Sequence, residues 1–527
     1  MVKKINRFIG ISLLLFVWSC AQVVAPTGGE RDISPPEITG SKPENGTTLF
    51  NSTKIEIEFN EYVVLKKLKE QLIISPPLKY PLKTKIKGKS LELLIKDTLK
   101  SNTTYVFNFG NAIVDLNEGN PISGFQYVFS TGAVLDSLTL SGLVIDAFSL
   151  TVEEDFLVML YPKFETDSVP SKELPSYVAR TDKEGNFTVT NIKEGVYQLV
   201  GLKDKNNNYL YDRPDEKVVF LNELISVQAN NESLRLYAFL KKDNKQFIEK
   251  QNLENAQLDL TFKLPLENLN FSLLDTTIEG FILDIEKLEN KSTLWLKEIS
   301  GRKLRIEISA ENFIDTIKFK TDTIVASQNL QMLSTLEGTK NYFEPIELEF
   351  NRPIQFIETD SITIIDNDSN TVPFTITRDS ISKRKMFLEI KFEKDKEYSV
   401  MILPHSFIDI YDTSTDTITA SLIFNKLEDF GKLEIKLSNT ISGAKLLQLT
   451  NPKGEKLREQ LVSDSITTFN FIAPGNYRLK LIYDRNENGL WDTGDFYQKL
   501  QPEKVILFDD PINIRKNWDK EINWILP

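Results

Sequence analysis

A short stretch rich in Asp and Asn occurs twice in this chain, and this repeat constrains the fold more than any other feature. The second copy, Tyr483–Asp495, reads YDRNENGLWDTGD, and the first copy lies in the first half of the chain, with Asp204 in the place of Asp484. The preceding strand repeats at the same spacing: Gly195, Tyr197 and Leu199 match Gly475, Tyr477 and Leu479. A segment that recurs together with its flanking strand indicates a duplicated module.

Both copies carry side-chain oxygens at loop positions 1, 3, 5, 9 and 12. The residues are Asp204, Asn206, Asn208, Asp212 and Asp215 in the first copy, and Asp484, Asn486, Asn488, Asp492 and Asp495 in the second. Together with the main-chain carbonyl of Leu210 or Leu490, such a loop can surround a hard cation. The spacing resembles the ion loops of EF-hand and dockerin-like repeats, although strands flank it here. It predicts a calcium site in each copy, and the alternative is a metal-free Asn/Asp turn.

The two loops differ at position 6, where the second has Gly489 and the first has Tyr209. Glycine adopts the sharp bend of such a loop without steric cost. The second loop is therefore the better calcium candidate.

The first residues read as a targeting segment and not as part of the fold. Lys3, Lys4 and Arg7 precede an apolar run, Phe8–Val17, which is too short to cross a bilayer as a helix. The run ends at Ser19-Cys20, and this order resembles the lipobox of bacterial lipoproteins. The resemblance implies that residues 1–19 are a signal peptide and that the Cys20 thiol is acylated. The alternative is an ordinary secretory signal followed by a chance cysteine.

Residues 20–35 then form a Pro- and Gly-containing tether. The lipoprotein reading implies an outer-membrane anchor in a Gram-negative cell. The residues after Cys20, AQVVAPT, lack an acidic cluster of the kind that resembles a surface-export signal, which favours the periplasmic face. Because Cys20 is the only cysteine, the chain forms no internal disulfide.

The folded part is dominated by period-2 alternation of apolar and polar residues, which predicts half-buried strands. Examples are Thr53–Phe59, Leu91–Ile95, Tyr105–Phe109 and Phe125–Phe129, while Leu65, Leu68 and Leu72 predict one short helix. The segments PPEITGSKPENG, IEIEFNEYV and NTTYVFNFGNAIVDLNEGNPISGFQYVFSTG resemble the bacterial Ig-like domain of S-layer type. The resemblance covers residues 36–132 and implies a sandwich, but it says little about function.

The alternation continues to the C-terminus and divides the chain into further sandwiches. Residues 137–240 resemble the transthyretin-like sandwich related to the carboxypeptidase regulatory-like domain and to Cna-B-type stalk modules, and residues 431–527 repeat that unit. Residues 241–325 are a middle β-sandwich without a family. Residues 326–426 are a divergent second Ig-like domain, because Ile346–Asn351 nearly repeats Ile55–Asn60 while the loop Asp409–Thr417 differs. The predicted fold is all-β, a duplicated pair of Ig-like and transthyretin-like sandwiches around a middle β domain.

Composition excludes several function classes. A net charge of −12, with the acidic residues spread along the chain, argues against a nucleic-acid surface, which needs a basic face. His405 is the only histidine, so Ser-His-Asp catalysis, Cys-His catalysis and histidine zinc sites lack their residues. His405 is predicted to lie in a surface loop. We predict no catalytic residues, and a hydrolase with paired carboxylates is the remaining enzymatic alternative.

A triplet of Asp, Ser or Thr, and an aliphatic residue recurs along the chain, and Asp136 and Asp360 begin two of its copies. It resembles the acceptor motif for O-glycosylation of exported proteins in some Gram-negative bacteria. This implies Ser137 and Ser361 as glycan acceptors. The alternative is a polar turn that enters a strand.

These features predict a lipid-anchored envelope protein that acts as a non-catalytic structural or interaction module. Its partners would be the membrane, through the lipid, and an envelope protein or glycan that the sequence does not identify. The alternative is a carbohydrate- or protein-binding surface lipoprotein, which should show an exposed aromatic platform. Trp295, Trp491, Trp518 and Trp524 are scattered, and the last two are predicted to pack in a C-terminal strand.

Overall fold

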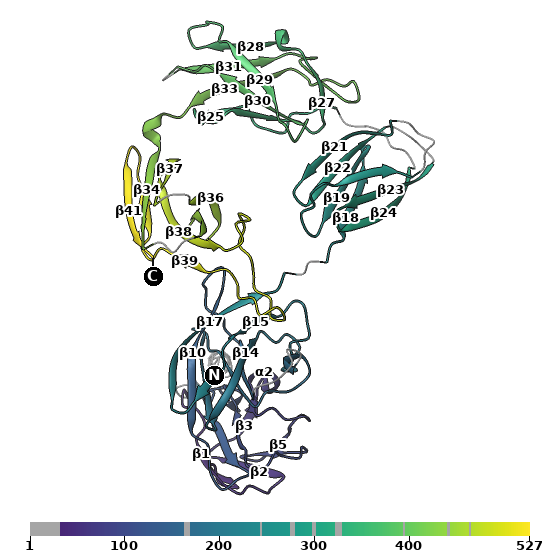
Figure 1. Cartoon of the computed structure of the whole chain (residues 1–527). Helices are drawn as coiled ribbons and strands as arrows, with labels where there is room; N and C mark the ends of the chain where they lie inside the picture. The colour runs from purple at the N-terminus through teal and green to yellow at the C-terminus, as the bar shows by residue number, and fades with distance from the viewer. Residues whose placement is uncertain are drawn as a thin grey trace, which may run out of the picture. The chain divides into compact units, whose positions relative to one another are not determined.

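The computed structural model describes residues 32–162, 169–242, 245–274, 280–297, 302–321, 329–393, 396–439, 443–462 and 465–526. Strands make up almost all of the regular structure, which confirms the predicted all-β class and its tandem sandwiches (Figure 1). The chain divides into two compact units. The first is Met1–Lys241 with Thr493–Pro502, and the second is Lys242–Asp492 with Glu503–Pro527.

The first sandwich contains the sheets β1-β2-β6-β5 and β4-β7-β9 and the pair β3-β8. In β2 the alternation works as predicted, because Ile55, Ile57 and Phe59 are buried while the residues between them are more exposed. The predicted helix is a single turn, α2 (Leu68–Gln71). The strands are β1 (Ile38–Lys42), β2 (Lys54–Phe59), β3 (Val63–Leu65), β4 (Ile73–Ser75), β5 (Lys83–Lys87), β6 (Ser90–Leu94), β7 (Thr104–Asn108), β8 (Ile113–Asp115) and β9 (Gln126–Ser130).

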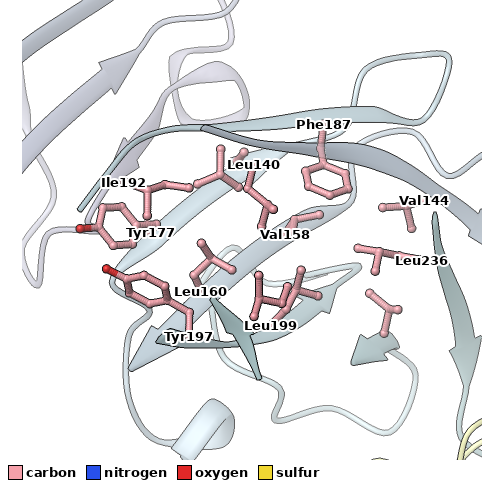
Figure 2. Close-up of a cluster of buried hydrophobic side chains, with 14 of the residues drawn as sticks. Leu140, Val144, Val158, Leu160, Tyr177, Phe187, Ile192, Tyr197, Leu199 and Leu236 are labelled. Atoms are coloured by element: carbon pink, nitrogen blue, oxygen red, sulfur yellow. The ribbon is translucent and has the colours of Figure 1, made fainter. Parts of the chain in front are cut away.

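The strands of the next sandwich are connected by hydrogen bonds into one continuous order, β12-β11-β14-β15-β17-β10-β13. Strand β16 also pairs with β14. Strands β10 and β17 are parallel, and the other pairs are antiparallel. Figure 2 shows its core, in which the Tyr177 and Tyr197 rings meet edge to face at 5.6 Å. The elements are β10 (Leu138–Asp146), β11 (Leu157–Pro162), the 3-10 turn Val169–Ser171, β12 (Tyr177–Arg180), β13 (Asn186–Ile192), β14 (Gly195–Leu202), β15 (Lys217–Phe220), β16 (Ile225–Val227) and β17 (Asn231–Leu240).

The second unit begins with a sandwich made of the sheets β18-β19-β22-β21 and β20-β23-β24. Leu258, Leu260 and Phe262 alternate inward from β19, and Trp295 is among the most deeply buried side chains of the described chain. The strands are β18 (Ile248–Glu254), β19 (Gln257–Phe262), β20 (Asn270–Leu273), β21 (Ile282–Leu288), β22 (Lys291–Leu296), β23 (Arg302–Ala310) and β24 (Phe313–Thr321).

The following sandwich repeats the pairings of the first one. The order β26-β30-β29 corresponds to β2-β6-β5, and the order β28-β31-β33 corresponds to β4-β7-β9. The pair β27-β32 corresponds to β3-β8. The predicted difference falls in the loop after β32, where the Asp409 carboxylate forms a buried ion pair with Arg352 at 3.1 Å. The elements are β25 (Gly338–Lys340), β26 (Ile346–Glu349), β27 (Ile354–Ile357), the 3-10 turn Thr359–Ser361, β28 (Ile362–Asp366), β29 (Phe374–Arg378), β30 (Lys385–Ile390), β31 (Glu397–Ile402), β32 (Phe407–Asp409) and β33 (Ile418–Phe424).

The last sandwich repeats the pairings of residues 138–240, including a parallel pair, β34 with β41. One pairing differs: β15 pairs with β17 in the earlier copy, whereas β39 and β41 stay in separate sheets of the described chain. The elements are the 3-10 turn Leu427–Asp429, β34 (Gly431–Ser438), β35 (Ala444–Thr450), β36 (Lys456–Val462), β37 (Ile466–Ile472), β38 (Gly475–Asp484), β39 (Val505–Leu507), β40 (Ile512–Ile514) and β41 (Asp519–Ile525).

Candidate functional site

The two Asp/Asn loops follow equivalent strands. The first loop leaves the end of β14 and returns to β15, and the second leaves β38 and returns to β39. Both strands lie inside their sheets, paired on both sides, so each loop starts from a fixed backbone.

The Asp at position 1 holds the turn of each loop. Asp204 accepts the N–H groups of Asn206, Asn207 and Tyr209 at 3.1, 2.7 and 2.7 Å. Asp484 accepts the N–H groups of Asn488 and Gly489 at 3.1 and 2.8 Å. Carboxylates stabilise turns through such bonds because they satisfy main-chain donors that the turn leaves unpaired.

The two Asn side chains connect to the Asp at position 9. Asn206 and Asn208 donate from Nδ2 to Asp212 at 3.2 and 2.7 Å. Asn486 and Asn488 do the same to Asp492 at 2.7 and 2.8 Å. Three of the five predicted side chains therefore meet in each loop, and the Asp at position 1 bonds the main chain of the same turn.

The backbones of the two loops also agree at positions 4 and 6. Asn207 and Glu487 have φ of 58° and 60°, and Tyr209 and Gly489 have φ of 61° and 75°. Tyr209 thus adopts the same left-handed bend as the glycine. For a non-glycine residue this conformation costs about 1–2 kcal/mol, which the Asp204 bonds help to offset.

The residues at position 12 lie elsewhere. Asp215 pairs with Arg213 at 2.9 Å and with Lys205 at 3.1 Å, and these bonds lower its pKa. Asp495 pairs with Lys241 at 2.8 Å. Burial acts to raise the pKa of Asp495. The Lys241 ammonium and two main-chain N–H groups outweigh burial, so the pKa is lowered overall. Within the described part of the chain, these ion pairs engage both carboxylates away from the other predicted ligands, and the role of Asp215 and Asp495 as twelfth ligands stays a prediction.

A different carboxylate closes each loop, and the sequence analysis missed it. Glu216 accepts the N–H groups of Lys205 and Arg213 at 3.1 and 3.2 Å. Glu503 accepts those of Arg485 and Asp492 at 2.7 and 3.0 Å. Both glutamates are buried, and burial raises the pKa of Glu216 although the main-chain N–H groups act to lower it.

A sequence signal for these glutamates exists. Glu216-Lys217-Val218 recurs as Glu503-Lys504-Val505, but not at the spacing that relates Asp204 to Asp484. The second copy lies further along the chain because it contains an insertion between Asp492 and Glu503. That insertion carries Asp495 out of the second loop.

The remaining predicted ligands are the main-chain groups of Leu210 and Leu490. The N–H groups of Leu210 and Leu490 donate to Asn208 and Asn488, each at 2.8 Å. Across the described residues, no three or more His, Cys, Asp or Glu side chains converge as a metal-binding group. Each loop therefore offers two carboxylates and two amides. Carboxylate and amide oxygens are the ligand types of hard cations, and in this structure the Asn208 and Asn488 oxygens accept the Leu210 and Leu490 N–H groups.

Hollows also lie outside the loops. One of about 470 Å³ is in the first unit, with a mostly polar lining that includes Gln71, Asn108, Gln126, Arg180 and Thr188. Another, of about 280 Å³, is in the sandwich of β25–β33, and we call it the aromatic hollow. Its wall contains Tyr342, Phe343, Phe392 and Phe424, with Glu344 and Glu389 beside them.

The other predicted positions are placed as follows. Cys20 lies outside the described residues. Ser137 is exposed just before β10, and Ser361 is partly buried at the end of its 3-10 turn. His405 is exposed in the turn between β31 and β32 with φ of 69°, which confirms a surface loop. Trp524 is buried in β41, whereas Trp518 is 41% exposed just before it. No helix of the described chain is long and apolar enough to span a bilayer.

Fold and sites together define a multidomain β-sandwich protein with loop-borne polar sites. Residues 32–131 match the bacterial Ig-like domain family, which confirms the resemblance predicted for residues 36–132. The match covers one sandwich of the chain, and the transthyretin-like resemblance stays a prediction. A search of curated protein sequences finds no match to the chain.

Solved structures similar to the chain are distant. The S-layer protein rSbsC(31-844) is 11% identical, with 90% of this chain and 67% of that chain covered and a TM-score of 0.15. The major pilin subunit BcpA of Bacillus cereus is 11% identical, with 74% and 99% covered and a TM-score of 0.14. The SGBP-B protein of a Bacteroides ovatus mixed-linkage glucan utilization locus, solved with a heptasaccharide, is 12% identical, with 72% and 91% covered and a TM-score of 0.18. At these TM-scores no residue role carries over.

Proposed function

We propose that the chain is a lipid-anchored, non-catalytic envelope protein in which tandem sandwiches act as a structural or interaction module. The observation that carries this proposal is the succession of β-sandwiches that starts with a bacterial Ig-like domain. The Lys3, Arg7 and Cys20 pattern supports the anchor, which we place in the outer membrane of a Gram-negative cell with its periplasmic face favoured.

The anchor has a direct test. Cys20→Ala should abolish acylation and leave the unprocessed precursor. The matched control is Ser19→Ala, which keeps a small residue before the cysteine and should be processed normally. A Cys20→Ala variant that matures and partitions into detergent like the wild type would contradict the lipoprotein proposal.

The two loops add calcium to this proposal. Each would hold the ion with the Asp residues at positions 1 and 9, the two Asn amides and a main-chain carbonyl, with water completing six or seven oxygens. The meeting of Asn486 and Asn488 with Asp492, in a turn whose main chain Asp484 bonds, supports it. Melting of the whole chain in calcium and in EDTA tests it, and identical curves would contradict it.

A second candidate function is glycan or protein binding, favoured by the aromatic hollow. Aromatic rings stack on the apolar faces of sugars, and carboxylates accept bonds from hydroxyl groups. Tyr342, Phe392 and Phe424 supply rings, of which Phe392 and Phe424 stack on each other, and Glu344 and Glu389 supply carboxylates. Affinity electrophoresis in a neutral β-glucan tests it. Phe392→Ala should abolish any retardation of the wild type, Phe356→Ala (an exposed ring of the same sandwich) should not, and an unretarded wild type would contradict glycan binding.

O-glycosylation at Ser137 or Ser361 is a further part of the proposal. The exposure of Ser137 supports it more than the partial burial of Ser361. The intact mass of protein from its native host tests it, because a mass that shows only the lipid would remove it.

A further inference from the structure

The insertion in the second Asp/Asn loop makes a contact that neither loop explains. We call Thr493–Pro502 the hook, and we call the aromatic side chains Tyr211, Phe220 and Phe239 the socket. The hook belongs to the first compact unit, although the chain before and after it belongs to the second. The hook and the socket are therefore neighbours in one unit despite their wide separation in sequence.

The centre of the hook is one fully buried ring. Phe496 has no exposed surface. Its ring meets Tyr211 edge to face at 5.8 Å and Phe220 at 5.4 Å. The Lys499 ammonium lies over the Phe496 ring at 4.6 Å from its centre. Aromatic pairs of this geometry contribute beyond the area that they bury, and a buried aromatic anchor is typical of a binding hot spot.

A glycine permits the close approach. A Cβ at Gly494 would lie 2.6 Å from the ring of Phe239 and 2.7 Å from the Leu500 carbonyl oxygen. Real Cβ atoms do not come this close to a ring or a carbonyl. A larger residue at Gly494 would therefore keep the hook out of the socket.

Polar contacts surround the ring. The Thr493 hydroxyl donates to the Leu240 carbonyl at 2.8 Å, and Gln501 Nε2 donates to the Phe220 carbonyl at 3.0 Å. Lys241 pairs with Asp495 at 2.8 Å. A buried apolar anchor inside a polar rim is the usual anatomy of a specific interface.

The hook is also shaped before it docks. Asp495 and Leu500 exchange main-chain hydrogen bonds at 2.8 and 2.9 Å, which close the segment into a turn. A preformed segment loses less conformational entropy on binding. The hook donates to the carbonyls of Phe220 and Leu240, which are the last residues of β15 and β17. These two strands pair with each other, whereas β39 and β41 do not pair in the described part of the last sandwich.

We propose that the socket is a docking site whose partner is the chain's own hook, and that docking fastens residues 242–492 into a closed loop. Because the hook and the socket lie on either side of residues 242–492 in the sequence, their contact can carry a pulling force. A pull between the N-terminus and Pro527 passes from the socket to the hook and then through the last sandwich, so it bypasses residues 242–430. That such a force acts on the chain depends on the proposed lipid anchor. The contact between hook and socket does not depend on the anchor.

Cutting the loop tests the fastening independently of the anchor. A protease recognition sequence is inserted after Lys242 in the full chain, which is then cleaved and passed over a sizing column. We expect the two halves of the wild type to elute together. Phe496→Ala and Gly494→Val should raise the dissociation constant of the halves by roughly 30-fold or more, the loss typical of a hot spot. Phe356→Ala, an exposed ring of the second unit, should leave them together.

Wild-type halves that separate, or Phe496→Ala halves that elute together as tightly as the wild type, would overturn the proposal. A charge exchange guards against a variant that fails to fold. Lys241→Glu should weaken the association of the halves, and Lys241→Glu with Asp495→Lys should restore it. Failure of the double variant to recover any of the loss would count against the docking geometry.

Discussion

The two Asp/Asn loops have the same backbone conformation but differ in the segment that follows them. In both, an Asp at position 1 holds the turn, two Asn side chains reach the Asp at position 9, and a buried Glu bonds the main chain on both sides. In the first loop that Glu follows at once, as Glu216. In the second, the hook intervenes before Glu503, and it docks on residues 171–241. The comparison shows that a loop closed by its own side chains tolerates an insertion, which is then free to bind elsewhere.

The largest expected effect tests whether the two glutamates are equivalent. Glu216→Ala and Glu503→Ala each leave two main-chain N–H groups without their charged acceptor. Each should lower the free energy of unfolding of its own sandwich by about 3–5 kcal/mol, from two charge-assisted bonds. Calorimetry of the whole chain measures the loss. Glu487→Ala, at an exposed position of the same loop, is the control, and a loss confined to one of the two Glu variants would break the equivalence.

A smaller effect separates the predicted twelfth ligand from the other four predicted side chains. At a hundredfold excess over its Kd, calcium should stabilise the second sandwich by about 2.7 kcal/mol. Asp484→Ala should abolish the difference between melts in calcium and in EDTA. Asp495→Asn should preserve that difference, because Asp495 pairs with Lys241 and not with the loop. If Asp495→Asn abolishes it as well, Asp495 is a ligand after all.

The smallest effect concerns the bend at position 6. No heavy atom lies within 4 Å of a Cβ built on Gly489, so Gly489→Ala adds backbone strain without a clash. It should destabilise the second sandwich by about 1 kcal/mol, as read from chemical denaturation. Gly454→Ala, also at positive φ in open space, should cost about the same. A neutral Gly489→Ala would mean that position 6 of the second loop does not hold the left-handed bend.

Much of the fold follows from the sequence, because period-2 alternation directly encodes which face of a strand is buried. Ile55, Ile57 and Phe59 are inside, as predicted. The duplication is visible because the strand before each loop repeats at a fixed spacing. Pairing is less predictable: the β15–β17 contact is long-range and depends on strand edges that no local pattern marks.

The loops show a similar limit. The turn residues were predictable because Asp and Asn bond to nearby main chain. The glutamates that close the loops were not, because the fixed spacing between Asp204 and Asp484 points to Asp495 and hides the insertion before Glu503. The burial of Phe496 has no local signal either, since its neighbours Asp495 and Tyr497 are polar and its socket lies in another part of the sequence.

The central claim is that the hook belongs to the first unit although it is inserted in the second Asp/Asn loop. Backbone amide hydrogen exchange of the full chain, wild type against Phe496→Ala, tests this most directly. The account predicts faster exchange in the variant across β15 and β17, by roughly a hundredfold or more, as expected for loss of a buried ring that supports them. Exchange in β39 and β41 should stay the same. Unchanged rates in β15 and β17 would contradict the claim.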